Sequence, residues 1–229
     1  MESLLRPTDD AQVREGVAWA LSENKPMAVI GAGSKALLGR PANLDTTMNL
    51  ADLTGVVDYE PSELVLTALP GTPLDEINTC LQEQNQELAF EPPDLGPLLG
   101  TDPDGATLGG TIACNLSGPR RVRVGAARDH FLGMHAVNGR AESFKAGGRV
   151  VKNVTGYDLC KLIAGSYGTL AILTEVTVKV LPRAEKTRTV LLFGLDDTEA
   201  ISALSNTAAS VHEPSALAHL PTAISDRSS

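Results

Sequence analysis

The chain has 229 residues, of which 42% are hydrophobic and 21% charged, so it can bury one large or two modest cores. Its formal charge of -9 argues against nucleic acid or an anionic membrane as the main partner, because both attract basic surfaces. The uncharged runs 105–119 and 162–174 are broken by glycines or too short to cross a bilayer, and the charged N-terminus is unlike a signal peptide. We therefore expect a cytoplasmic protein without a transmembrane segment.

The N-terminal half predicts helices and short strands in alternation. Residues 8–24 carry apolar side chains at helical spacing. Apolar and β-branched runs predict strands at residues 27–30, 43–48, 55–59 and 63–69. Thr72-Pro73 opens a second helix that we expect to reach about residue 87, and residues 91–104, rich in Pro, Gly and Asp, are expected to form a loop.

Beyond residue 104 the sequence consists of short β-branched runs separated by glycines, which is typical of an antiparallel sheet. We expect strands at residues 111–113, 130–137, 143–144 and 168–180, and the last run is the strongest strand signal in the chain. A new unit begins after Pro182, with a strand at 187–193, a helix at 197–209 and a second strand ending at His219-Leu220-Pro221.

A glycine loop, GAGSKALLGRP at residues 31–41, follows the first apolar strand and fits the G-x-G-x-x-A pattern of a dinucleotide-binding loop, with Asp52 where a ribose-binding acid is sought. Pro41 leaves too few residues for a crossover helix, so we expect no helix after the loop. The backbone N–H groups of such a loop can still bind phosphate, with Ser34 and Lys35 as additional donors. A plain surface turn is the alternative.

A second cluster of small residues, ATLGGTIACNLSGPRR, occupies residues 106–121. A stretch that avoids bulk at nearly every position is explained by backbone approaching a flat ligand. A tight inter-strand bulge is the alternative explanation.

Other residues with chemical potential favour structural interpretations. Cys80, Cys114 and Cys160 are too few and too far apart for a disulfide framework, a zinc site or an iron–sulfur cluster, so we expect buried apolar residues and no metal. His130 and His135 are also expected to be structural. The basic residues Arg120, Arg121, Arg123 and Arg128 suit a solvated turn or a partner contact, with a phosphate or substrate carboxylate as the alternative.

Six motifs together resemble the FAD-binding domain of the vanillyl-alcohol oxidase and p-cresol methylhydroxylase (PCMH) superfamily and, within it, the FAD-binding E subunits of bacterial glycolate oxidases. They cover residues 25–183 and are GSKALLGRP, VLTALPGTPL, FEPPD, GGTIACNLSGPRR, RDHFLG and KNVTGYDLCKLIAGSYGTLAILTE. The resemblance implies an α+β fold with a small βαβ-type lobe to about residue 100, a larger antiparallel lobe to about 183 and FAD in the cleft between them. Residues 1–183 would form the PCMH-type domain, and residues 184–229 resemble the first part of an α+β cap, so the chain looks truncated.

The resemblance also implies a set of cofactor-binding residues. Gly31, Ala32, Gly33, Ser34 and Lys35 would hold the pyrophosphate; Pro70 and Gly71 would line the flavin; Gly109, Gly110, Thr111, Ser117 and Gly118 would cradle the isoalloxazine and ribityl chain; and Thr169, Ala171 and Ile172 would contact the adenosine half. Ala32 and Ala171 replace the Gly of many relatives and fit only where φ is negative. Tyr157-Asp158 either helps to position the flavin or is a packed Tyr beside a capping Asp. No His lies near the loop, so noncovalent FAD is expected.

By resemblance, the chain would be an FAD-dependent subunit of a glycolate (2-hydroxy-acid) oxidase or dehydrogenase complex in glycolate metabolism. Its partners would be a second flavin subunit and an iron–sulfur subunit, and any membrane association would arise through them. The catalytic residues are unknown, because His212 and His219 form no His-x-His cluster, and we expect no activity from the subunit alone. Two alternatives are a self-sufficient flavin oxidoreductase of unknown substrate and a scaffold subunit that has lost useful flavin affinity.

Overall fold

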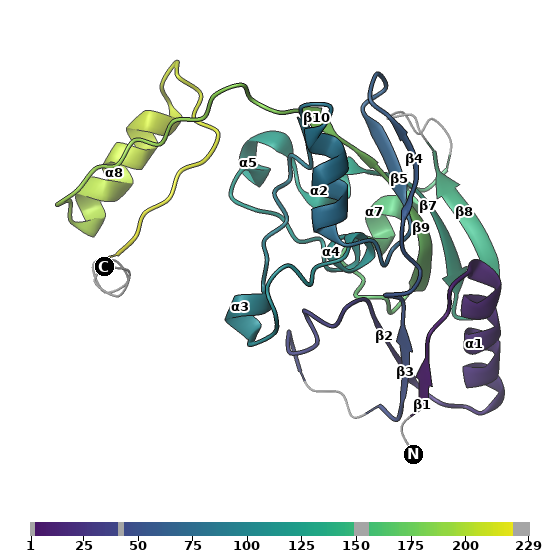
Figure 1. Ribbon diagram of the computed structural model, residues 1–229. Coiled ribbons are helices and arrows are strands. Elements are labelled where there is room, and N and C mark those ends of the chain that lie inside the picture. Colours follow the sequence, from purple (N-terminus) through teal and green to yellow (C-terminus); the bar gives the residue numbers. More distant parts are fainter. Residues whose placement is uncertain (1–2, 41–43, 149–155, 222–229) are drawn as a thin grey trace.

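Two sheets carry the α+β architecture of the computed structural model, which describes residues 3–40, 44–148 and 156–221 (Figure 1). A parallel sheet has the order β1-β3-β2, with β1 at Ser3–Leu5, β2 at Met27–Ile30 and β3 at Thr46–Asn49. An antiparallel sheet has the order β4-β5-β9-β7-β8, with bounds Val56–Glu60, Val65–Ala68, Ala171–Lys179, Phe131–Asn138 and Ser143–Gly147. The expected fold class and most of the expected strands are confirmed.

Helix α1 (Asp10–Ser22) joins the two sheets. The Asp9 carboxylate caps it by accepting from the Gln12 amide at 2.8 Å, and Val13 and Val17 are buried against the sheets. These two residues share a core with Met48, Leu50, Leu53, Val137 and Ile172. Because this core takes residues from both sheets, the sheets pack as one body around it.

The second helix is shorter than expected. Helix α2 (Leu74–Gln82) ends five residues before Glu87, and β6 (Gln86–Glu87) pairs antiparallel with β10 (Leu181–Pro182). The reversal occurs at Asn85, whose φ of 52° lies in the left-handed region that Asn tolerates. A strand pairing with a segment far along the chain therefore ends the helix, and sequence periodicity does not report such a pairing.

The boundary expected between the lobes, near residue 100, is wrong. Strands β4 and β5 belong to the antiparallel sheet, and Leu74, Ile77 and Leu81 of α2 lie in the core of that sheet. The part built on the parallel sheet consequently ends near Leu53.

The strand expected at residues 111–113 is a helix. Thr107 caps helix α4 (Leu108–Cys114), and Asn115 ends it with a φ of 51°. The first free amides of the helix donate outside it, from Leu108 to Thr72 O and from Gly109 to Pro70 O. These contacts fix a helix in a sequence whose β-branched and glycine content favours a strand. The shorter helices are α3 (Gly96–Leu99), which lies in the expected loop, α5 (Arg121–Val124), α6 (Ala127–His130) and α7 (Leu159–Ile163).

The last described segment carries helix α8 (Asp197–Ala208), close to the expected 197–209 and capped by Asp196 and Glu199. The strands expected at 187–193 and at His219-Leu220-Pro221 are wrong, because these residues form no strand and Val190 and Phe193 are 83% and 84% exposed. Figure 1 shows α8 apart from the two sheets. No described helix is long and apolar enough to cross a membrane.

Candidate functional site

A pocket of about 380 Å³ lies where the parallel sheet, helix α4 and the start of β9 meet. Strand β2 and the glycine loop form one wall through residues 27–36. Thr107, Gly109 and Gly110 contribute from the start of α4, and residues 166–169 with 171–173 contribute from the turn before β9 and from the strand itself. The pocket thus gathers three segments that are distant in the sequence.

Most of the expected cofactor-binding residues line this pocket, and four do not. The lining members are Gly31, Ala32, Gly33, Ser34, Lys35, Pro70, Gly109, Gly110, Thr169, Ala171 and Ile172. The lining does not include Gly71, Thr111, Ser117 or Gly118.

Each of those four residues has a packing role. A Cβ atom on Gly71 would lie 2.1 Å from Leu50 O, and one on Gly118 would lie 2.6 Å from Glu91 O, so both glycines allow close backbone packing. Thr111 is fully buried in α4, and the Ser117 hydroxyl accepts from the Ala127 amide at 2.8 Å. Gly71 and Thr111 therefore pack within segments that form the wall, whereas Ser117 and Gly118 contact residues outside the lining.

The glycine loop is a chain of turns without a following helix, as the short spacing to Pro41 predicts. Gly33 has a φ of 81°, and the Gly33 carbonyl accepts from the Ala36 amide at 2.9 Å. Neither Ala32 nor Ala171 has a positive φ, so an alanine is accommodated at both positions without backbone strain.

Close backbone approach holds the pocket walls together. A Cβ atom on Gly31 would lie 2.5 Å from Thr107 Oγ1, and one on Gly109 would lie 2.5 Å from the Cβ of Pro70. Real Cβ atoms do not approach this closely, so both positions require glycine unless a neighbour shifts. The absence of side chains leaves main-chain groups at the pocket surface, where a ligand can contact them.

Lys35 gives the pocket a half-buried positive charge. The ammonium donates to Ser34 Oγ at 3.1 Å, and no carboxylate of the described chain lies within ion-pair distance of it. Burial lowers the pKa of Lys35 below its ordinary value, while Cys114 and Asp94 act weakly in the opposite direction. A desolvated cation beside a glycine loop favours an anionic ligand such as a phosphate.

Reactive settings are absent at Cys114, Cys160, His130 and His135. Burial raises the pKa of Cys114, and it raises that of Cys160 to about 11, so both thiols stay protonated near neutral pH. The His130 ring lies within 2.9 Å of Val124 O and packs on Phe90. His135 lies beside Glu175, and neither histidine lines the pocket. Among the described residues, no His, Cys, Asp and Glu group is arranged to hold a metal ion.

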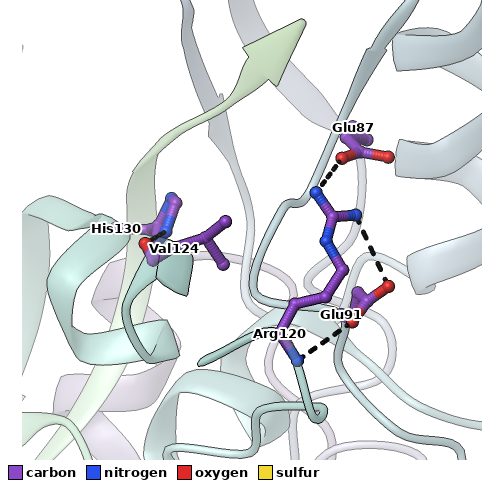
Figure 2. A network of polar contacts seen from close by, with 5 residues as sticks. All are labelled: Glu87, Glu91, Arg120, Val124 and His130. Atoms are coloured by element: carbon purple, nitrogen blue, oxygen red, sulfur yellow. Dashed lines mark hydrogen bonds and ion pairs between the residues drawn. The ribbon is translucent and has the colours of Figure 1, made fainter. Parts of the chain in front are cut away.

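The basic cluster is divided between internal pairs and solvent. Arg120 donates to Glu87 at 2.8 Å and to Glu91 at 3.4 Å, and its backbone amide donates to the Glu91 carboxylate, as Figure 2 shows. Arg123 pairs with Glu213, and Arg121 and Arg128 are exposed. Arg120 therefore joins the turn after α4 to the β6 region and is engaged away from the pocket.

The structure tests the two interpretations of Tyr157-Asp158 residue by residue. Asp158 caps α7 by accepting from the Lys161 amide at 3.2 Å, which confirms the capping role. Tyr157 is 93% exposed and lies outside the pocket lining, so a packed Tyr is wrong. Lys152 to Thr155, the start of the last motif, lie outside the described residues.

A family described as FAD binding domain matches residues 1–147. The chain belongs to this FAD-binding family. It is 44% identical over 181 residues to glycolate oxidase subunit GlcE of Escherichia coli K12, covering 79% of this chain and 49% of that protein. It is 26% identical over 191 residues to glycolate oxidase subunit GlcD of Bacillus subtilis 168, covering 83% and 39% respectively.

A D-lactate dehydrogenase of Anaerostipes hadrus is 30% identical over 183 residues, covering 79% of this chain and 36% of that protein. The chain thus spans about half the length, or less, of the curated relatives it matches. An alkyldihydroxyacetonephosphate synthase structure superposes with a TM-score of 0.62 at 22% identity, covering 78% of this chain and 31% of that one, which shows the shared PCMH-type fold. The cofactor class is FAD rather than the nicotinamide dinucleotide that G-x-G-x-x-A alone allows.

Several lining residues were missed by the sequence analysis. Thr107 carries a signal that could have found it, because Thr before a run of small residues is a helix N-cap. Ser166 and Tyr167 lie within the last of the six motifs and also line the pocket, although the resemblance assigns neither of them to the cofactor. The Ser166 hydroxyl is buried and has no hydrogen-bond partner in the part of the chain that the structure describes, a costly state for a polar atom.

Proposed function

We propose that this chain is the FAD-binding subunit of a glycolate, or related 2-hydroxy-acid, oxidase or dehydrogenase complex. The observation that carries the proposal is the 44% identity to the E. coli glycolate oxidase subunit over 79% of this chain. The match to a second glycolate oxidase subunit supports the same substrate class. Bound FAD would supply an acceptor for a hydride, which carries two electrons, and these electrons could then pass to a partner.

The pocket is the proposed FAD site. Gly31 to Lys35 would hold the diphosphate, because the loop has main-chain groups free of side chains and Lys35 is a cation without an ion-pair partner among the described residues. Pro70, Gly109 and Gly110 would border the flavin, and Thr169, Ala171 and Ile172 the adenosine half. Gly71, Thr111, Ser117 and Gly118 would act indirectly, by fixing the segments that carry the lining residues.

The lining residues differ in exposure, which suits a cofactor with one reacting ring. Pro70 and Gly109 are buried, and their side of the pocket offers the water exclusion that hydride transfer needs. Ala32, Tyr167 and Thr169 are exposed.

The pocket lining lacks a general base for hydroxy-acid oxidation. Its described residues include no His, Asp or Glu, and Lys35 is the charged residue among them. A base has to take the hydroxyl proton as hydride leaves the substrate carbon. We propose that residues outside this pocket, or a partner subunit, provide the base, and that the partners are a second flavin subunit and an iron–sulfur subunit. Residues 1–183 would form the PCMH-type FAD-binding domain, and residues 184–229 would form part of a C-terminal cap domain.

The test is anaerobic mixing of the FAD-loaded chain with glycolate or D-lactate while the flavin absorbance is followed. Slow bleaching by the chain alone and rapid bleaching once partner subunits are added are the expected results. Rapid stoichiometric bleaching by the chain alone would instead favour a self-sufficient oxidoreductase. A purified chain that retains no flavin after FAD loading would favour a scaffold subunit.

A further inference from the structure

The turn before β9 holds an aromatic residue in a backbone conformation that suits glycine. Tyr167 has a φ of 55°, between Gly165 at 83° and Gly168 at 74°. Among the described non-glycine residues with positive φ, Tyr167 is the one aromatic. A left-handed conformation is unfavourable for a bulky L-residue, and such strained residues gather at ligand sites.

Contacts with helix α4 impose this conformation. The Tyr167 amide donates to Ala113 O at 2.9 Å, and the Gly165 amide donates to Ile112 O at 3.2 Å, so the turn satisfies carbonyls at the end of α4. On the opposite side, a Cβ atom on Gly168 would lie 3.5 Å from the Cβ of Val29 in β2. The turn is therefore fixed between two walls of the pocket. A glycine at residue 167 would adopt the same positive φ without strain.

Core packing of the Tyr167 side chain does not offset the strain of its positive φ. It is 56% exposed, lies outside both described hydrophobic clusters and lines the pocket. No hydrogen bond of its hydroxyl to another described residue is present. A large aromatic surface on a fixed backbone turn in the pocket lining suits stacking on a planar ring.

The position of the turn selects which ring. Tyr167 lies two residues from Thr169, which borders the proposed adenosine half, and both residues are exposed, whereas Pro70 and Gly109 beside the proposed flavin are buried. The rings of a flavin dinucleotide flank its diphosphate, and the reacting ring needs the end from which water is excluded. The exposed turn that carries Tyr167 and Thr169 is left for the ring that does not react.

We propose that Tyr167 stacks on the adenine of the bound dinucleotide and makes this chain select FAD over FMN. The proposal rests on the placement of FAD in this pocket. Stacking of an aromatic side chain on a base raises the binding affinity about tenfold or more. Tyr167 is in this sense an adenine-binding residue without a part in electron transfer.

The test measures the dissociation constants of ADP, FMN and FAD by calorimetry for the wild-type chain and variants. Tyr167→Asn removes the ring and keeps a residue that tolerates positive φ, and Tyr167→Gly is the second variant should the first fail to fold. Tyr167→Phe keeps the ring, and Tyr157→Asn is the matched control, because Tyr157 is also an exposed tyrosine but lies outside the pocket lining. Thermal unfolding of each variant checks that the turn is intact.

We expect Tyr167→Asn and Tyr167→Gly to weaken ADP and FAD binding about tenfold or more and to leave FMN binding within about twofold. Tyr167→Phe and Tyr157→Asn should bind all three as the wild type does. The proposal is overturned if both ring-less variants bind ADP as the wild type does, if the loss appears for FMN instead, or if the wild type binds FMN as tightly as FAD. None of these results decides whether the complex oxidises a hydroxy acid, because the flavin-bleaching assay tests that proposal separately.

Discussion

Gly31 and Thr107 lie so close together that a Cβ atom on Gly31 would be 2.5 Å from Thr107 Oγ1. Gly31 directly follows strand β2 and begins the glycine loop, and Thr107 caps helix α4. Their contact sets the distance between the loop and the helix that border the pocket, so it determines the shape of the proposed diphosphate site.

We expect Gly31→Ala to lower the free energy of unfolding and to weaken FAD binding, because the new methyl group collides with the Thr107 hydroxyl. Adding Thr107→Ala should restore part of both, since the nearest remaining contact is then the Cβ of residue 107 at 3.5 Å. Thr107→Ala alone should cost about 1 kcal/mol or less, because it removes a cap whose hydrogen bond to Gly110 is long at 3.4 Å. Urea unfolding of the four proteins measures this coupling, and strictly additive losses would contradict it.

Gly33→Asp should abolish FAD binding while the protein stays folded. Gly33 has a φ of 81° and open space around its Cβ position, so the new carboxylate would face the diphosphate rather than the core. Gly33→Ala is the control: it shares the backbone cost of roughly 1–2 kcal/mol but brings no charge, so it should keep most of its flavin. Flavin fluorescence after gel filtration reports occupancy, and an Asp variant with wild-type occupancy would show that the loop does not hold the diphosphate.

The lowered pKa of Lys35 predicts opposite effects of alkaline pH on the free protein and on FAD binding. In the free protein, burial disfavours the charged form, so its stability cost is present at neutral pH and is relieved as pH rises through the lowered pKa. The diphosphate favours the charged form, and FAD affinity should fall over the same pH range. Titrations from neutral pH to about pH 10 measure both trends.

Two substitutions test the assignment of that titration. Lys35→Met should weaken FAD binding at neutral pH and flatten its alkaline dependence, whereas Lys35→Arg should keep the affinity and also flatten the curve, because a guanidinium stays charged throughout. An unchanged alkaline fall in the Met variant would assign the titration to another group.

The flavin should be released intact by acid precipitation. No His lines the described pocket, and burial raises the pKa of Cys114, which keeps the nearest thiol protonated and weakly nucleophilic. Absorbance of the supernatant measures the released FAD. Yellow colour that persists in a washed pellet would demonstrate a covalent link.

The sequence predicts local features well where the local signal and the tertiary contacts agree. Strand β2 occupies residues 27–30 as expected, and the unbroken β-branched run before Pro182 forms β9. The short spacing between Ser34 and Pro41 correctly excludes a helix after the glycine loop. Each of these depends on residues within one segment.

The wrong expectations involve partners far along the chain. Helix α4 forms because its free amides reach Thr72 and Pro70, and α2 ends where β6 meets β10. Strands β4 and β5 pair in the antiparallel sheet rather than in the expected N-terminal lobe, because strand pairing is a long-range property that local sequence does not report. For the site, the glycine clusters identified both main walls, whereas the position of Tyr167 depends on a hydrogen bond to Ala113 that no pattern in the turn reveals.

The exposed run from Val190 to Phe193 bears on how the chain behaves in solution. Its apolar side chains are uncovered, and its backbone forms no hydrogen bond with other described residues. Short apolar segments with high β-propensity and no charge are templates for intermolecular strand pairing. The isolated chain should therefore aggregate as its concentration rises, and a lysine in place of Leu191, which interrupts the run without touching the pocket, should delay that aggregation.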